Sequence, residues 1–301
     1  MGSPFEIGLL QLALDGTPEE NLEKALQGVR NAAARGARLI CLPELYRSPY
    51  FCQTEDPRFF DLAETVAGGP SAQAFSALAR ELGVVLVVPI FERRAPGLYH
   101  NSALILDADG RLAGLYRKMH IPDDPGYFEK FYFTPGDRET FAFETAVGPV
   151  GVLICWDQWF PEAARLSALQ GASVVVIPTA IGWHPREKEP LGERQLDAWV
   201  TVQRGHAVAN GVYLAAVNRV GRERPVPHGE GIEFWGHSFI AGPQGEMLCR
   251  AGAGAEDILL ATVDPAHLEA VRRNWPFLRD RRIDAYAGLL ARFLDGPRGG
   301  P

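Results

Sequence analysis

Short apolar runs alternate with amphipathic segments along most of this chain. The runs are nearly continuous, as is typical of strands buried on both faces, and we expect them at 5–14, 39–42, 84–90, 173–177 and 212–218. Segments with helical periodicity are expected at 17–35, 71–82, 161–170 and about 191–210. Thr17 and Pro18, followed by two glutamates, form a helix start. The alternation predicts an α/β fold in which helices cover the strands.

From Asn101 onward the pattern changes to hairpins. Paired strands are expected at 103–106 with 112–116, at 140–145 with 150–154, and within 239–249. A last strand at 258–263 precedes a helical tail that begins at about 265 and ends in a Gly- and Pro-rich stretch, which we expect to be disordered. No composition break, linker or repeat divides residues 1–301, so the sequence predicts a single domain.

Three chemically useful side chains close three separate strand-like runs. Glu44 follows Leu39–Leu42 and Pro43, Lys118 ends the run that begins at Leu112, and Cys155 follows Val150–Ile154. Lysine occurs at only four positions in the chain, whereas arginine fills most basic positions. The lysine at 118 is therefore a candidate functional residue. Because α/β folds place their chemistry at strand ends, we expect the three side chains to meet.

Each of these residues also has an ordinary structural explanation. A cysteine in an apolar strand is most often a small core residue, which is how we interpret Cys41 and Cys249. A glutamate after a proline is commonly a solvated loop residue, and Lys118 beside Arg117 is typical of a charged surface. The joint occurrence of the three, in order, favours the catalytic interpretation.

Three motifs resemble the signatures of the nitrilase superfamily of carbon-nitrogen hydrolases. They are Pro43-Glu44, Tyr116-Arg117-Lys118 with Pro135-Gly136-Asp137, and Ile154-Cys155-Trp156-Asp157 with Phe160-Pro161-Glu162. The match runs from Phe5 to about Leu294. The resemblance implies a four-layer α-β-β-α sandwich, a catalytic triad of Glu44, Lys118 and Cys155, and a second carboxylate at Glu129. It also implies a cysteine thioester intermediate and a homodimer or higher homo-oligomer.

The nucleophile motif narrows the substrate class. Strict nitrilases resemble Cys-Trp-Glu-Asn here, whereas this chain has Cys155-Trp156-Asp157-Gln158, which favours amide or carbamoyl cleavage. Segments 122–133, 178–183 and 279–282 resemble one group of the superfamily, the N-carbamoylputrescine amidases of polyamine synthesis. The chain departs from that group at His184, where a glutamate usually precedes the proline. Another acid would then have to receive a diamine, and the candidates are Asp157, Glu187 and Glu189.

The substrate-binding candidates surround these motifs. They are Trp156, Asp157, Tyr50, Tyr127, Ala180 and His184. An amidase or carbamoylase for a carboxylate-bearing substrate, such as N-carbamoyl-β-alanine or an ω-amide, is the main alternative, with Arg186 or Arg194 as its anchor. A non-catalytic interaction protein on the same scaffold is a further alternative.

Charge and composition exclude several other classes of protein. The net charge of −7, without a basic cluster, argues against nucleic acid as a partner. No run reaches the about 18 apolar residues of a membrane span and no signal peptide is recognisable, so we expect a cytoplasmic protein and no membrane partner. Four scattered cysteines predict neither disulfides nor a zinc site. His120 and His184 match no ligand spacing, so no metal or cofactor is expected.

Overall fold

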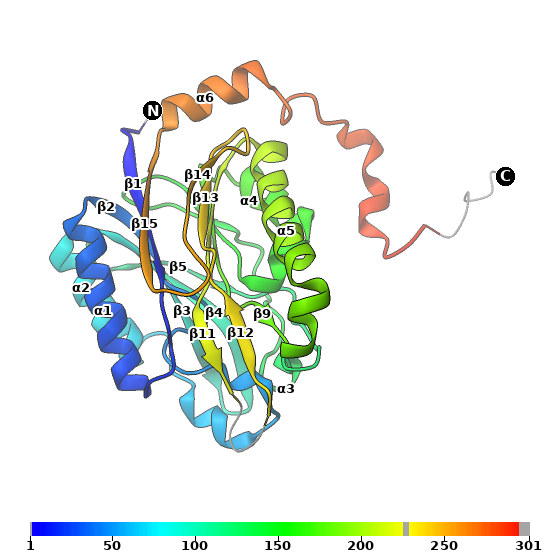
Figure 1. Ribbon diagram of the computed structural model, residues 1–301. Coiled ribbons are helices and arrows are strands. Elements are labelled where there is room, and N and C mark those ends of the chain that lie inside the picture. The colour runs from blue at the N-terminus through cyan, green and yellow to red at the C-terminus, as the bar shows by residue number, and fades with distance from the viewer. Residues whose placement is uncertain (1, 225–228, 295–301) are drawn as a thin grey trace.

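The computed structural model describes residues 2–224 and 229–294, and Figure 1 shows their arrangement in layers. Two β-sheets lie face to face at the centre. Helices α1 (Pro18–Ala34) and α2 (Pro70–Leu82) cover the outer face of one sheet, and α4 (Pro161–Leu169) and α5 (Pro185–Asn210) cover the other. The expected α-β-β-α order of layers is therefore confirmed.

The first sheet has the strand order β15-β1-β2-β3-β4-β5. Its strands are β1 (Phe5–Gln11), β2 (Ala37–Cys41), β3 (Val85–Ala95), β4 (Leu98–Leu106), β5 (Leu112–Arg117) and β15 (Asp257–Val263). The parallel pairs β1–β2 and β2–β3 are joined by α1 and α2. Helix α1 begins after Thr17, as predicted. The structure adds a capping box, in which the Thr17 hydroxyl accepts from the Glu20 N–H and the Glu20 carboxylate accepts from the Thr17 N–H.

The second sheet has the strand order β14-β13-β10-β8-β7-β6. Its strands are β6 (Ala142–Phe143), β7 (Val150–Val152), β8 (Val174–Pro178), β10 (Tyr213–Val217), β13 (Phe239–Ala241) and β14 (Met247–Arg250). A small third sheet, which the sequence did not predict, has the order β11-β12-β9. It contains β9 (Gly182–Trp183), β11 (Val220–Glu223) and β12 (Ile232–Trp235).

Alternate residues of the first sheet enter two different cores. Ile7 and Leu9 of β1 face the second sheet, where they join one cluster of buried side chains. Leu10 and Ile40 face α1 and α2 and belong to a second cluster. Because successive strand residues point to opposite faces, a strand covered on both sides must be apolar at every position. This explains the continuous apolar runs in the sequence.

Short elements complete the part of the fold around the strand ends. They are η1 (Phe51–Gln53), η2 (Pro57–Leu62), α3 (Glu129–Tyr132) and η3 (Cys155–Trp159). At the C-terminal end, α6 (Pro265–Asn274) begins where the sequence predicted a helical tail, and η4 (Ile283–Ala285) and η5 (Ala287–Leu290) follow it. Figure 1 shows this last segment leading away from the body of the protein. The Gly- and Pro-rich end lies outside the described residues.

Two secondary-structure expectations need correction. Helix α5 begins at Pro185 rather than near Leu191, and it contains Pro190. Its first turn is held by the His184 cap and by ion pairs of Arg186 and Lys188 with the β11–β12 hairpin. Strand β3 extends past Ile90 because its charged end pairs with β4 beyond the apolar core, where hydrophobic pattern gives no signal.

Across residues 2–224 and 229–294, no helix has both the length and the apolar character that crossing a bilayer requires.

Candidate active site

Cys155 lies in a tight turn where the second sheet meets η3. The thiol follows β7 at the point where the chain leaves the strand, and its backbone has a φ of 45°. A non-glycine residue rarely adopts a positive φ, and such strain, about 1–3 kcal/mol, persists at sites where the surroundings enforce it. Cys155 is 4% exposed, so its sulfur is accessible only from a cavity.

Lys118 joins the two glutamates that the sequence singled out. Its Nζ lies 2.9 Å from Oε1 of Glu44 and 2.6 Å from Oε2 of Glu129, and all three side chains are buried. Glu44 follows β2, Lys118 follows β5, and Glu129 begins α3. The structure thus brings Glu44, Lys118, Glu129 and Cys155 to one place, because three strand ends and one short helix converge there.

Neighbouring polar groups hold the two carboxylates. The Nδ2 of Asn101 donates to Oε1 of Glu44 at 2.7 Å, and the hydroxyl of Tyr50 donates to Oε1 of Glu129 at 2.7 Å. Among the described residues, Oε2 of Glu44 is buried without a hydrogen-bond partner. That oxygen is therefore available to a proton donor within the site. Asn101 was missed in the sequence, although a polar residue inside the apolar strand β4 was a usable signal.

Burial and charge set the protonation of these groups. Burial would lower the pKa of Lys118, but the charges of Glu129 and Glu44 outweigh it and raise that pKa well above its usual value. Burial raises the pKa of Glu129 to about 7 against the opposing effect of Lys118. Burial and the charge of Glu44 raise the pKa of the Cys155 thiol, while Lys118 and a backbone hydrogen bond from Ala180 lower it. The resting thiol therefore needs a base.

A pocket of about 470 Å³ leads from the surface to Cys155. Trp156, Tyr127 and Ala180 line its walls, and His184 lies at the start of α5. The hydroxyl of Tyr127 is tied to the Gly182 backbone, donating to the oxygen at 3.1 Å and lying 3.0 Å from the nitrogen. A cavity of this size with a few polar groups is typical of a small-molecule site.

Comparisons with known proteins identify the family. The sequence pattern of the carbon-nitrogen hydrolases matches residues 6–273. The chain belongs to the carbon-nitrogen hydrolase family. It is 46% identical to the N-carbamoylputrescine amidase of Oryza sativa subsp. japonica over 99% of this chain and 97% of that protein. It is 39% identical to the citrullinase of Francisella tularensis subsp. tularensis, over 96% of this chain and 99% of that protein.

A solved structure agrees with this assignment. The carbon-nitrogen hydrolase of Helicobacter pylori G27 is 48% identical and matches with a TM-score of 0.92 over 97% of this chain and 100% of that one. The family resemblance drawn from the three motifs and the expected four-layer sandwich are both confirmed.

The outer part of the hydrolase pocket carries two acidic side chains. Asp124 and Glu187 line it and are exposed. The Nε2 of Gln195 donates to Oε2 of Glu187 at 3.3 Å. Among the residues that the structure describes, no lysine or arginine lines this pocket. The two carboxylates therefore give the described lining of the pocket a net negative charge.

The other charged candidates lie outside the pocket of the hydrolase. Glu189 is exposed on a different side of α5, since two residues turn a helix by about 200°. Arg186 pairs with Glu230 at 3.1 Å, and neither it nor Arg194 lines the cavity. The cationic anchor that a carboxylate-bearing substrate would need is thus absent from the described lining.

Two of the six substrate-binding candidates are not brought to the pocket wall. Tyr50 lies behind Glu129 and donates to it. Asp157 is fully buried and its oxygens accept hydrogen bonds from Tyr116, His120 and Ile154. Proximity to Cys155 in the sequence suggested a contact with substrate, but the turn at Cys155 directs Asp157 into the protein instead.

A buried arginine supports the loop that carries Glu44. The Nη2 of Arg219 donates to the carbonyl oxygens of Glu44, Leu45 and Ser48 at 3.0, 3.0 and 3.3 Å. Its Nη1 lies 2.8 Å from Oε1 of Glu223, whose other oxygen accepts from the Tyr50 N–H. The sequence did not point to this pair, although two opposite charges so close to an apolar strand were a signal.

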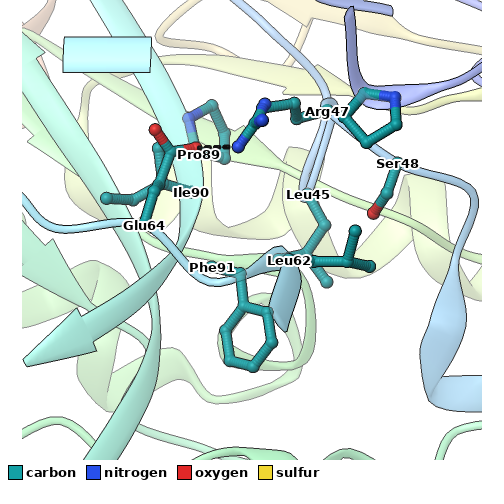
Figure 2. Close-up of a pocket in the computed structure, with 9 residues that line it drawn as sticks. Leu45, Arg47, Ser48, Leu62, Glu64, Pro89, Ile90 and Phe91 are labelled. Carbon is teal, nitrogen blue, oxygen red and sulfur yellow. Dashed lines mark ion pairs between the residues drawn. The ribbon is translucent and has the colours of Figure 1, made fainter. Parts of the chain in front are cut away.

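A second ion pair involves Arg47 of the same loop. Figure 2 shows Arg47 reaching Glu64 across a small void beside Leu45, and the closest atoms of the pair are 3.7 Å apart. The void has about 10 Å³, close to the smallest volume that holds one water. The void is too small for a substrate. We therefore interpret the Arg47–Glu64 pair beside it as a structural contact that supports the loop.

The described parts of the chain contain no group of three or more histidine, cysteine, aspartate or glutamate side chains arranged to hold a metal ion.

Proposed function

We propose that this hydrolase cleaves the ureido group of N-carbamoylputrescine, giving putrescine, ammonia and CO₂ in polyamine synthesis. The observation that carries the proposal is the acidic outer pocket, in which Asp124 and Glu187 lie without a lysine or arginine in the described lining. Such a pocket favours a substrate whose distal end is an ammonium group. The rice relative is named for the same substrate.

Cys155 is the nucleophile in the proposed reaction. Glu44 takes the thiol proton through Oε2, and Sγ attacks the ureido carbon to form a tetrahedral oxyanion. Lys118 and the backbone N–H of Trp156 stabilise that oxyanion. When the intermediate collapses, the proton held by Glu44 passes to the departing nitrogen and ammonia leaves. The product of this half-reaction is a carbamoyl thioester on Cys155.

Hydrolysis of the thioester reverses the proton transfers. Glu44 takes a proton from water, the hydroxide attacks the thioester carbon, and the thiolate of Cys155 leaves and recovers its proton. The carbamate that is released decomposes to CO₂ and the diamine. Glu129 holds Lys118 in place throughout, because its carboxylate binds the ammonium at 2.6 Å.

The face of α5 that lines the pocket determines the substrate specificity in this proposal. His184, Glu187, Gln195 and Ala198 all line the pocket, and Glu187 lies about one helical turn beyond His184. Glu187 therefore provides the negative charge that His184 does not. Its carboxylate is presented to the pocket with one oxygen bonded to Gln195.

A comparison of charged and neutral substrates tests the proposal. Ammonia release is measured on N-carbamoylputrescine, N-butylurea, citrulline and N-carbamoyl-β-alanine, with Cys155→Ala as the blank. We expect N-carbamoylputrescine to have the highest kcat/KM. We expect Glu187→Gln to raise its KM about 10-fold, equivalent to about 1.4 kcal/mol, and to leave N-butylurea unaffected.

Glu189→Gln is the matched control, since it removes an equal charge from the same helix outside the pocket. Equal effects of the two substitutions would mean that general charge, not a local contact, sets the KM. Preference for citrulline, the substrate named in the Francisella relative, or for N-carbamoyl-β-alanine would overturn the diamine assignment.

We also propose that the protein acts as a homodimer or higher homo-oligomer in the cytoplasm. The tail beyond α6 exposes large apolar side chains, including Leu290 at 95% and Phe293 at 77%. Extended apolar surface of this kind is typical of an interface. Size-exclusion chromatography with light scattering gives the molar mass, and a monomer at micromolar concentration would contradict the proposed oligomer.

The cytoplasmic location is proposed because the cytoplasm is reducing and keeps a catalytic thiol in its free form.

A further inference from the structure

Asp157 is a buried carboxylate that the proposed mechanism does not use. Each of its oxygens accepts two hydrogen bonds from protein groups. Oδ1 accepts from the backbone N–H of His120 at 2.9 Å and lies 2.8 Å from Nδ1 of the same residue. Oδ2 accepts from the Tyr116 hydroxyl at 2.7 Å and from the Ile154 N–H at 3.0 Å. The side chain is fully buried.

The four donors come from the two segments that carry the catalytic thiol and amine. Tyr116 and His120 each lie two residues from Lys118, on opposite sides of it. Ile154 directly precedes Cys155, and Asp157 itself is two residues after Cys155. The first segment leaves the edge strand of one sheet and the second leaves a strand of the other. One carboxylate therefore joins the two sheets beside both catalytic residues.

The same carboxylate bonds to the backbone that holds Cys155 in its strained conformation. The Ile154 N–H binds Oδ2, and the Asp157 N–H donates back to the Ile154 oxygen at 3.0 Å. These two bonds close a turn around Cys155, whose φ is positive. Strained backbone at a functional site persists only where surrounding contacts fix it, and here Asp157 supplies them.

We propose that Asp157 is a positioning residue that fixes the thiol of Cys155 relative to the ammonium of Lys118. A displacement of about 1 Å between reacting groups can reduce a rate about 100-fold. The carboxylate accepts four hydrogen bonds at once. It therefore fixes the position of the turn at Cys155 relative to the segment that carries Lys118. This inference rests on Cys155 as the nucleophile but not on the identity of the substrate.

Asp157→Asn is the principal test, because it keeps the shape and replaces one acceptor oxygen with an NH₂ donor. Whichever way the amide turns, its NH₂ faces a backbone N–H, from Ile154 or from His120, that needs an acceptor. We expect kcat to fall about 100-fold while KM changes less than about 3-fold. We expect alkylation of Cys155 by iodoacetamide, followed by mass spectrometry, to slow at least about 10-fold at pH 7.5.

Tyr116→Phe is a milder variant with a matched control. It removes the 2.7 Å bond to Asp157, and we expect kcat to fall about 5-fold. Tyr213→Phe removes another buried hydroxyl, which accepts from the Asp264 N–H at 3.2 Å beside the start of α6 and does not line the pocket. We expect the two variants to lower Tm similarly, and Tyr213→Phe to leave kcat and alkylation unchanged.

The outcomes separate positioning from simple stabilisation of the fold. Normal kcat and alkylation in folded Asp157→Asn would overturn the proposal, as would equal losses of kcat in Tyr116→Phe and Tyr213→Phe. If Asp157→Asn does not fold, the two tyrosine variants decide the question by the same comparison. Activity retained by Cys155→Ala would instead overturn the proposed mechanism. The alkylation assay needs no substrate, so it tests the positioning role of Asp157 separately from the proposed function.

Discussion

The buried cluster beside Cys155, which we call the inner end of the site, and the outer end of the pocket hold their carboxylates in opposite ways. At the inner end Glu44 and Glu129 are fully buried and bind Lys118, Asn101 and Tyr50. At the outer end the carboxylates of Asp124 and Glu187 are exposed, and one amide contact holds Glu187. Contacts within the protein fix the inner carboxylates, whereas the outer carboxylates are exposed to solvent. Substitutions should therefore affect kcat at the inner end and KM at the outer end.

The largest expected effect is that of Lys118→Gln. This substitution leaves two buried carboxylates next to each other without their counterion. Breaking a buried ion pair on one side costs about 3–5 kcal/mol, so we expect a marked loss of the free energy of unfolding as well as a loss of kcat of at least about 1,000-fold. Urea denaturation and ammonia release measure the two effects.

Lys130→Gln is the control for that substitution. Lys130 is exposed on α3, directly after Glu129, and its side chain forms no ion pair with the described residues. We expect its kcat and stability to equal those of the wild type. An active and stable Lys118→Gln protein would show that neither stability nor activity depends on the charge of Lys118 between the two carboxylates.

The sequence predicted much of the inner end, because its main residues lie where strands end. Glu44, Lys118 and Cys155 each follow an apolar run, and the layered fold brings those runs together regardless of side-chain detail. That the whole of 1–301 forms one domain stays a prediction, as do the catalytic roles. Tyr50, Asn101 and Arg219 could not be placed, because their partners are distant in the sequence and depend on exact side-chain direction.

The outer end was much less predictable. Glu187 and Glu189 were equivalent in the sequence, but they lie about 200° apart around α5, and only the first lines the pocket. Which of them faces the pocket depends on the helix that carries both, and the sequence placed the start of that helix near Leu191 rather than at Pro185. Asp157 was misleading for the opposite reason, since the positive φ at Cys155 directs it away from the cavity. Small backbone features thus decide which polar residues meet the substrate.

A smaller effect is expected from Tyr50→Phe, and it appears in the pH profile. The hydroxyl of Tyr50 helps to lower the pKa of Glu129, which burial raises to about 7. Only the ionised carboxylate holds Lys118, so activity is present above that pKa and lost as the pH falls through it. Removing the hydroxyl raises the pKa, so we expect the acid limb of kcat/KM to move to higher pH and kcat at pH 7 to fall about 10-fold.

The profile is measured from pH 5 to pH 9 on wild type, Tyr50→Phe and Tyr213→Phe. Only the Tyr50 variant should shift, because the hydroxyl of Tyr213 bonds to the Asp264 backbone instead of the cluster. An acid limb that stays in place in Tyr50→Phe would mean that Glu129 does not control it.

The smallest expected effect separates the two ends without any substitution. Salt screens exposed charges, with a Debye length of about 10 Å at 0.1 M and about 3 Å at 1 M, and it has little access to buried pairs. Asp124 and Glu187 are exposed, whereas Lys118 and its two partners are buried. Between 50 mM and 500 mM NaCl we expect the KM of N-carbamoylputrescine to rise about 3-fold and its kcat to stay constant. Neutral N-butylurea should show neither change, and a KM equally salt-dependent for both substrates would mean that the outer carboxylates do not recognise the ammonium.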